Sequence, residues 1–309
     1  MIVVYILLAI LVSSIIFHFV MIYALFLRFY GRISAKKMEK NLHKDPYYHD
    51  YLPLIKECRD KLEGRYEDVY TEAFDRLKLH GFYFDNNSKR IVIMFHGAHS
   101  SAFNNFGYIA NNMLDHGYSL LIIDERAHGL SEGKYFTYGV KEHKDVLTWV
   151  DFVKNNYPDK EIILYGISMG AHSIALASDQ LDERIVKAMV LDSSFENIDE
   201  LFDNIMKTHH VPTFLFGRAV GFLSIHKAGM EYRTWHVRDH ISKTKVPCLF
   251  VHGDADNVAP IPFFMDNYNA CSSRKEKMVI KGASHTLPMT VGKEEAFNKL
   301  YQFLEGNYE

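Results

Sequence analysis

The amino-acid sequence predicts an α/β fold in which an eight-stranded, mostly parallel sheet is covered by helices on both faces. From residue 66 onward, short apolar runs alternate with longer amphipathic stretches, as expected for buried parallel strands joined by crossover helices. The chain has 309 residues, of which 48% are hydrophobic and 24% charged, which suffices for one large packed domain plus an appendage. The first 27 residues predict that appendage, an N-terminal transmembrane helix.

Eight runs have the length and apolar character of strands: Tyr66–Ala73, Leu77–Phe84, Ile91–Phe95, Ser119–Ile123, Glu161–Tyr165, Val186–Leu191, Val246–Val251 and Lys277–Ile280. Five longer stretches predict helices: Ser101–His116, Val140–Asn156, Met169–Asp179, Pro262–Ala270 and Gly292–Glu305. A short turn near Asp75 joins the first two runs, so we expect that pair to be antiparallel, whereas strands separated by helices are expected to be parallel.

The N-terminal apolar run contains no Lys, Arg, Asp, Glu, Pro or Gly through residue 27. As a helix it would be roughly 40 Å long, and a bilayer core requires only ~20 residues. A cleaved signal peptide is the alternative, but Met1 is followed directly by Ile2 and Val3 instead of basic residues, and no small-residue cleavage site follows. We therefore expect residues 1–30 to be an uncleaved anchor in contact with membrane lipid.

Only the α-amino group precedes the apolar run of residues 1–27, whereas six basic residues follow it: Arg28, Arg32, Lys36, Lys37, Lys40 and Lys44. The positive-inside rule then predicts a single-pass protein whose main domain faces the cytoplasm. An extracytoplasmic domain, with these charges facing lipid head groups, is the alternative. Three cysteines, Cys58, Cys248 and Cys271, do not make a disulfide framework, and this favours a reducing compartment.

The remaining chain divides into a helical linker, residues 31–65, and a domain, residues 66–309, by composition and turn signals. Within the domain, residues 193–245 are too long for a simple crossover and predict a small helical cap, with a loose surface excursion as the alternative. Two helical pieces are expected in it, Asn197–His209 and Thr213–Ser224. The insertion is rich in aromatic residues: Phe195, Phe202, Phe214, Phe216, Phe222 and Trp235.

The strand Glu161–Tyr165 leads into Gly166-Ile167-Ser168-Met169-Gly170, and a helix is expected from Met169. This is the G-x-S-x-G pattern in the strand–turn–helix context of a nucleophile elbow. The turn strains the backbone at the serine and leaves no room for side chains two positions before and after it, so both glycines are required. We expect Ser168 to be a nucleophile and the Met169 N–H to bind an oxyanion. A tight turn without function is the alternative.

A base and an acid should follow the nucleophile in the order Ser–Asp–His. The last predicted strand leads to His285, at the sheet edge where the serine also emerges. The preceding strand ends near Asp254 and Asp256, either of which could orient the histidine. By strand alternation, Asp254 should point to a sheet face beneath a helix, while Asp256 should lie in the loop above the edge. Asp256 is therefore the expected acid. The backbone N–H of Ala98, after the strand Ile91–Phe95, is the expected second oxyanion donor.

Six segments together resemble the α/β-hydrolase superfamily: His96-Gly97, Asp124–Ser131, Gly166–Gly170, Leu191–Ser194, His252–Asp256 and Gly282–His285. The resemblance covers roughly residues 66–305. Within the superfamily, the chain looks similar to bacterial membrane-anchored or secreted hydrolases described as esterase-like or related to prolyl-oligopeptidase-type serine peptidases. This resemblance implies the α/β-hydrolase fold and the triad Ser168, Asp256 and His285. The absence of a His-Gly-Gly-Gly loop disfavours the hormone-sensitive-lipase-like branch.

The resemblance also implies that Asp124, Arg126, Asp145 and Asp192 are structural, whereas His128 could approach the pocket. Metal binding is not expected. The pairs His236/His240 and His209/His210 lack a zinc-site pattern. No cofactor is needed, and the net charge of -3 gives no nucleic-acid footprint.

The sequence therefore predicts a serine hydrolase that cleaves a carboxylic ester through an acyl-enzyme, with a small-molecule ester or acyl compound as substrate. A peptidase or amidase of the prolyl-oligopeptidase-like type is the alternative enzyme. A catalytically silent hydrolase-fold binding protein is the alternative outside enzymes. An intact Ser168, His285 and acid argue against the silent form.

Overall fold

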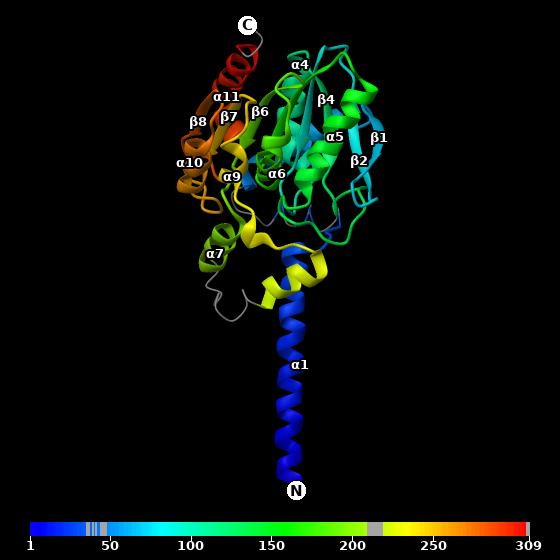
Figure 1. The fold of residues 1–309 in the computed structure, drawn as a ribbon, viewed down its shortest axis with the longest axis vertical. Coiled ribbons are helices and arrows are strands. Elements are labelled where there is room, and N and C mark those ends of the chain that lie inside the picture. Colours follow the sequence, from blue (N-terminus) through cyan, green and yellow to red (C-terminus); the bar gives the residue numbers. More distant parts are fainter. Residues whose placement is uncertain (35–37, 39, 41, 44–47, 209–218, 307–309) are drawn as a thin grey trace.

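The structure is a computed structural model that describes residues 1–309 apart from 35–37, 39, 41, 44–47, 209–218 and 307–309. A mixed sheet lies at its centre, with strand order β1-β2-β4-β3-β5-β6-β7-β8 (Figure 1). The strands are β1 (Glu67–Glu72), β2 (Lys78–Phe84), β3 (Arg90–Phe95), β4 (Ser119–Asp124), β5 (Glu161–Ile167), β6 (Val186–Asp192), β7 (Cys248–Gly253) and β8 (Lys275–Ile280).

The predicted eight-stranded, mostly parallel sheet is confirmed. β1 pairs antiparallel with β2, as the short turn between them requires. β2 also pairs antiparallel with β4, a partner that the sequence did not identify. From β4 to β8 every neighbouring pair is parallel, because helices return the chain to the start of each new strand.

Helices cover both faces of the sheet because alternate strand residues point to opposite sides. The helices of one face are α5 (Glu142–Asn156), α6 (Met169–Ala177), α9 (Val237–Ile241) and α10 (Ile261–Ala270). Those of the other are α3 (Leu52–Leu62), α4 (Ala102–Asp115) and α11 (Pro288–Glu305). In β5, Leu164 belongs to the first apolar layer, with Trp149 of α5, and Ile163 to the second, with Phe106 of α4.

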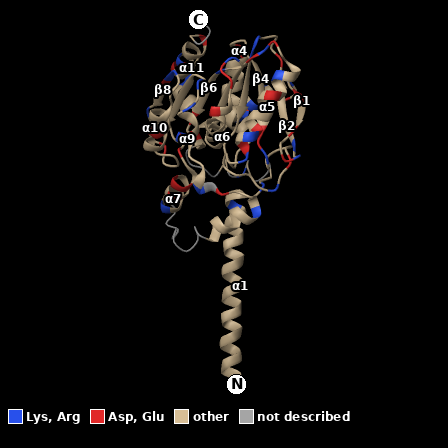
Figure 2. Cartoon of the chain, in the orientation of Figure 1, with Lys and Arg blue, Asp and Glu red and all other residues tan. Residues whose placement is uncertain are grey.

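The N-terminal helix α1 (Ile2–Tyr30) projects from the domain as a long stalk (Figure 1). Among the described residues it is the one helix long and apolar enough to cross a membrane. Figure 2 shows no charged residue along most of the stalk, and blue basic residues where it meets the domain. Residues 1–20 are exposed, whereas Phe26 and Tyr30 are fully buried against the domain. Helix α1 therefore has an exposed part and a part that packs on the domain.

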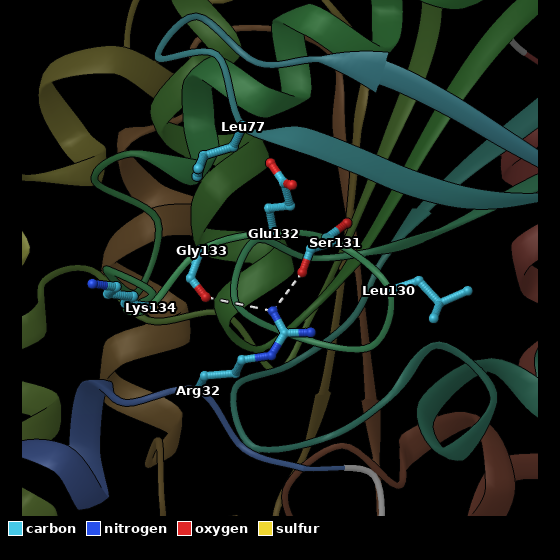
Figure 3. A pocket seen from close by; sticks show the side chains of 7 residues that line it. All are labelled: Arg32, Leu77, Leu130, Ser131, Glu132, Gly133 and Lys134. Atoms are coloured by element: carbon cyan, nitrogen blue, oxygen red, sulfur yellow. Dashed lines mark hydrogen bonds between the residues drawn. The ribbon is translucent and has the colours of Figure 1, made fainter.

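The chain after α1 is fixed to the loop that follows β4. Gly31 forms a β-bridge with Tyr135, and the Arg32 guanidinium donates to the carbonyl oxygens of Gly129 and Ser131, both at 2.6 Å. Figure 3 shows Arg32 reaching across this loop, beside a pocket of about 610 Å³ that Lys134 also lines. No flexible segment separates the stalk from this loop.

The predicted linker, residues 31–65, is also joined to the domain where the structure describes it. Helix α3 buries Ile55, Cys58 and Leu62, and Asn111 of α4 donates to the Cys58 carbonyl at 2.8 Å. This part of the linker therefore belongs to the domain core. All three cysteines are buried and unpaired.

The predicted cap, residues 193–245, contains α7 (Ile198–Thr208), close to the expected first helical piece. Of the second expected piece, residues 213–218 lie outside the described residues, as does His209. Residues 219–228 are helical, and the last five, Ser224–Ala228, form a π-helical turn. We call this segment the cap helix 219–228. Figure 1 shows it, in yellow, beside the root of α1.

Candidate active site

The turn between β5 and α6 has the strained geometry that the sequence predicts. Ser168 has φ 54° and ψ −112°, a region that residues with a side chain rarely occupy. A Cβ on Gly166 would lie 2.4 Å from the Ala171 nitrogen, and one on Gly170 would lie 1.9 Å from the Phe95 carbonyl oxygen. Both positions therefore admit only glycine, and the serine is held at the tip of a rigid turn.

At this tip, two neighbouring strands continue into helices on opposite faces of the sheet. From β3 the chain passes to α4 on one face, and from β5 it passes to α6 on the other. Loops that diverge from neighbouring strands in this way leave the usual binding crevice of open α/β sheets. The loop after β3 lies directly against the serine, because a Cβ on Gly97 would be 3.3 Å from the Ser168 Cβ.

The structure brings together the serine, the histidine and one of the two aspartates. His285 Nε2 lies 2.8 Å from Ser168 Oγ, and His285 Nδ1 lies 2.7 Å from Asp256 Oδ2. The Asp256 side chain is fully buried, whereas 18% of the His285 side chain is exposed. The two contacts link the Ser168 hydroxyl, the His285 ring and the buried Asp256 carboxylate in one continuous chain.

Asp256 is held as a carboxylate by its surroundings. Burial raises its pKa, but the facing His285, the hydrogen bond from that ring and the nearby His252 outweigh burial and bring the pKa below its usual value. Its other oxygen, Oδ1, accepts the backbone N–H groups of Val258 and Ala259 at 2.9 and 2.8 Å. These two bonds fix the orientation of the carboxylate and leave Oδ2 for the histidine.

The prediction that Asp254 lies beneath a helix is wrong. Instead of lying beneath a helix, its side chain is exposed and accepts the Gly282 N–H at 2.5 Å. Strand β7 ends at Gly253, so the alternation of sides does not extend to Asp254. Asp254 thus braces the loop that carries His285, without reaching the ring itself.

The two expected oxyanion donors flank Ser168. Met169 is the first residue of α6 and is fully buried, so its N–H is among those at the helix N-terminus that have no partner within the helix. Ala98 follows Gly97, on which a Cβ would lie 3.3 Å from the Ser168 Cβ. Both residues belong to one apolar cluster on this side of the sheet.

The four acidic and basic residues assigned to structural roles lie in buried networks. Arg126 pairs with Asp145 through two contacts, at 2.6 and 2.7 Å. Asp124 contacts the His80 ring at 2.8 Å and accepts the Leu130 N–H. Asp192 accepts from the Ser193 hydroxyl at 2.9 Å, and burial raises the pKa of Asp192 to about 7.

The histidines singled out in the sequence show no metal site among the described residues. His236 contacts Glu196 at 3.2 Å, and His240 contacts Asp179 at 3.0 Å, so the two rings have separate carboxylate partners. His128 is fully buried, with its ring 4.9 Å from that of His96. Burial holds the pKa of His128 well below its usual value. His210 lies outside the described residues.

The aromatic residues of the cap have different environments. Phe195 is fully buried and stacks on His172 at 4.2 Å. Phe202 packs on Tyr30, and Trp235 packs on His143. Phe222 is 61% exposed and belongs to none of the three apolar clusters of the described residues. Phe214 and Phe216 lie outside the described residues.

Two contacts near the site were not anticipated from the sequence. The Tyr48 hydroxyl makes a hydrogen bond to the hydroxyl of Thr286, the neighbour of His285. The Tyr138 hydroxyl lies 3.2 Å from His99 Nε2, next to Ala98. Neither tyrosine falls in a motif, because contacts between distant loops leave no local pattern.

Comparison with known proteins agrees with this geometry. A family described as serine aminopeptidase, S33, matches residues 86–211. The uncharacterized protein YqkD of Bacillus subtilis is 24% identical over 222 residues, which cover 71% of this chain and 72% of YqkD. The solved esterase Pf2001 of Pyrococcus furiosus is 28% identical, with a TM-score of 0.64 over 80% of this chain and 94% of the esterase.

A solved membrane phospholipase A, described as a bacterial virulence factor, has a TM-score of 0.63 over 85% of this chain and 94% of its own. At 17% identity that likeness concerns the fold alone. The family match, the esterase structure and the eight-stranded sheet with its serine turn lead to one assignment. The chain belongs to the α/β-hydrolase superfamily and is a hydrolase.

Proposed function

We propose that the protein is a serine hydrolase that cleaves carboxylic esters, with Ser168 as nucleophile, His285 as base and Asp256 as the orienting acid. The observation that carries the proposal is the pair of contacts at His285: 2.8 Å from Nε2 to Ser168 Oγ and 2.7 Å from Nδ1 to Asp256 Oδ2. A donor hydrogen on Nδ1, facing the carboxylate, leaves Nε2 free to accept the serine proton.

Catalysis would proceed in two steps. Ser168 Oγ bonds to the ester carbonyl carbon while its proton passes to His285 Nε2, and the N–H groups of Ala98 and Met169 stabilise the oxyanion. The carbon–oxygen bond to the leaving alcohol then breaks as His285 protonates that oxygen. Water next attacks the acyl-enzyme, and His285 takes its proton and returns one to Ser168. The products are a carboxylic acid and an alcohol.

An ester is favoured over an amide as substrate because the solved esterase Pf2001 is 28% identical over most of the chain. The peptidase alternative rests on the description of the matching family as serine aminopeptidase. Turnover of matched ester and anilide substrates with the same acyl group separates the two. Faster turnover of the anilide would favour the peptidase.

A fluorophosphonate probe tests the nucleophile. We expect the wild type to be labelled and Ser168→Ala to lose both labelling and ester turnover. Ser173→Ala is the matched control, because Ser173 lies in the helix that follows Ser168 and its hydroxyl donates to the Met169 carbonyl. Labelling that persists in Ser168→Ala, or an unlabelled wild type, would contradict the proposal. The second result would favour a catalytically silent binding protein.

We further propose that α1 anchors the chain and that the catalytic domain faces the cytoplasm. The basic residues at the root of α1, including Arg28 and Arg32, support this orientation. Protease added to intact cells should then leave the domain uncut, whereas lysed cells should show cleavage. Cleavage in intact cells would place the domain outside.

A further inference from the structure

The exposed part of α1 has the length of a bilayer core. The first 21 residues are exposed, and domain contacts begin at Ile22 and Tyr23. Twenty helical residues extend about 30 Å, which equals the thickness of the hydrocarbon core. With that part in lipid, no length of helix remains to raise the domain above the membrane. The face of the domain at the root of α1 would then lie on the bilayer surface.

The packed part of α1 reaches toward the proposed oxyanion hole. The Tyr30 ring lies 5.8 Å from that of Tyr138, whose hydroxyl contacts His99, the neighbour of Ala98. Phe26 and Tyr30 also share one apolar cluster with Met169, the residue after Ser168. Apolar side chains thus pack without interruption from α1 to the residues beside Ser168.

The cap helix 219–228 lies at the same place with apolar residues on two faces. Val220 and Leu223 are buried in the cluster that contains Phe26 and Met169. Phe222 is 61% exposed and Ile225 is 40% exposed. The π-helical turn Ser224–Ala228 contacts α1. Exposed apolar residues beside a membrane helix match a segment that lies in the lipid interface.

We propose that the substrate is an acyl ester resident in the bilayer, and that its acyl chain reaches Ser168 along the cluster formed by the packed part of α1 and the cap helix 219–228. This inference rests on the proposed ester hydrolysis. The exposed side chains of Phe222 and Ile225 hold the cap helix 219–228 in the lipid interface, so that an acyl chain can leave the bilayer without crossing water. A long-chain ester in a membrane should therefore be a better substrate than a soluble acetate.

Full-length protein in phosphatidylcholine vesicles provides the test, with 4-methylumbelliferyl oleate in the bilayer and 4-methylumbelliferyl acetate in water. The double variant Phe222→Ser/Ile225→Ser should lower the oleate rate at least tenfold more than the acetate rate. Val279→Ser is the matched control, because Val279 on edge strand β8 is 44% exposed. The control should keep the wild-type ratio of the two rates.

The outcomes separate this inference from the proposed function. A wild type that hydrolyses acetate but not oleate would overturn the inference and leave the proposed function standing. Equal losses on both esters in the double variant, or the same change in ratio in Val279→Ser, would also overturn it. Hydrolysis of neither ester, with Ser168 unlabelled by fluorophosphonate, would contradict the proposed function and the inference together.

Discussion

Replacement of Asp256 by asparagine tests the proposed site at the point where the geometry is most restrictive. Oδ1 of Asp256 accepts two backbone N–H groups, from Val258 and Ala259. In Asp256→Asn the amide oxygen must take this place, because an NH2 group cannot accept a hydrogen bond. The NH2 group then faces His285 Nδ1, which must become an acceptor. The ring hydrogen moves to Nε2, which can no longer accept the serine proton.

The expected loss follows from the wrong tautomer and the missing charge. The same change in a serine protease triad lowers turnover by ~10⁴, which corresponds to about 5.5 kcal/mol of transition-state stabilisation at ~1.4 kcal/mol per tenfold. We expect a loss of up to this size in the turnover of a soluble acetate ester. The thermal midpoint should change little, since the asparagine keeps the shape and the two backbone hydrogen bonds.

Asp254→Asn is the matched control, since it makes the same chemical change two residues away. Its side-chain oxygen can still accept the Gly282 N–H, so turnover should stay within a few-fold of the wild type. The reasoning would be refuted by near-normal turnover in Asp256→Asn, or by an equal collapse in Asp254→Asn.

Two further predictions concern buried positions outside the proposed triad. Glu125 is buried, its carboxylate accepts no hydrogen bond from the described residues, and burial raises its pKa well above the ordinary 4.5. The Glu125 carboxyl therefore keeps its proton to a higher pH in the folded state than in the unfolded chain. The free energy of unfolding should then fall as pH rises above about 4.5, by at most ~1.4 kcal/mol per pH unit. In urea unfolding in detergent between pH 4 and 8, Glu125→Gln should make this fall in the free energy of unfolding less steep, and an unchanged slope would contradict the raised pKa of Glu125. Gly170→Ala should prevent folding, because its Cβ would lie 1.9 Å from the Phe95 carbonyl oxygen. Gly64→Ala is the control: Gly64 has φ +74° and no atom within 4 Å of the added Cβ, so thermal unfolding should show a cost of only about 1–2 kcal/mol. A folded Gly170→Ala protein with wild-type stability would contradict the predicted clash.

The sheet and the serine turn were predictable because local patterns determine them. Apolar runs such as Ile91–Phe95 and Val246–Val251 can be buried on both faces only inside a sheet. The glycines at 166 and 170 fix the elbow, since the crowding around them comes from neighbouring backbone. The order of motifs along the chain then indicated His285 at the same sheet edge.

Other features depended on information that the sequence does not carry locally. The end of β7 at Gly253 decides the direction of Asp254, and Gly253 lies against Ala283, which belongs to another loop. An apolar run has the same composition whether it contacts lipid or protein, so the sequence did not predict that Phe26 and Tyr30 are buried against the domain. The exposure of Phe222 was hidden for the same reason.

The direct attachment of α1 to the domain determines which form of the protein can be purified. A flexible tether would let the domain be cut free at residue 30 without harm. Here such a cut removes Phe26 and Tyr30, which are fully buried. Buried aromatic side chains cover ~150–250 Å² each, so the cut would uncover an apolar area as large as the biggest patch on a typical monomer, ~300–600 Å². A truncated domain made for solubility should therefore aggregate, and the intact chain in detergent or nanodiscs is the form to purify.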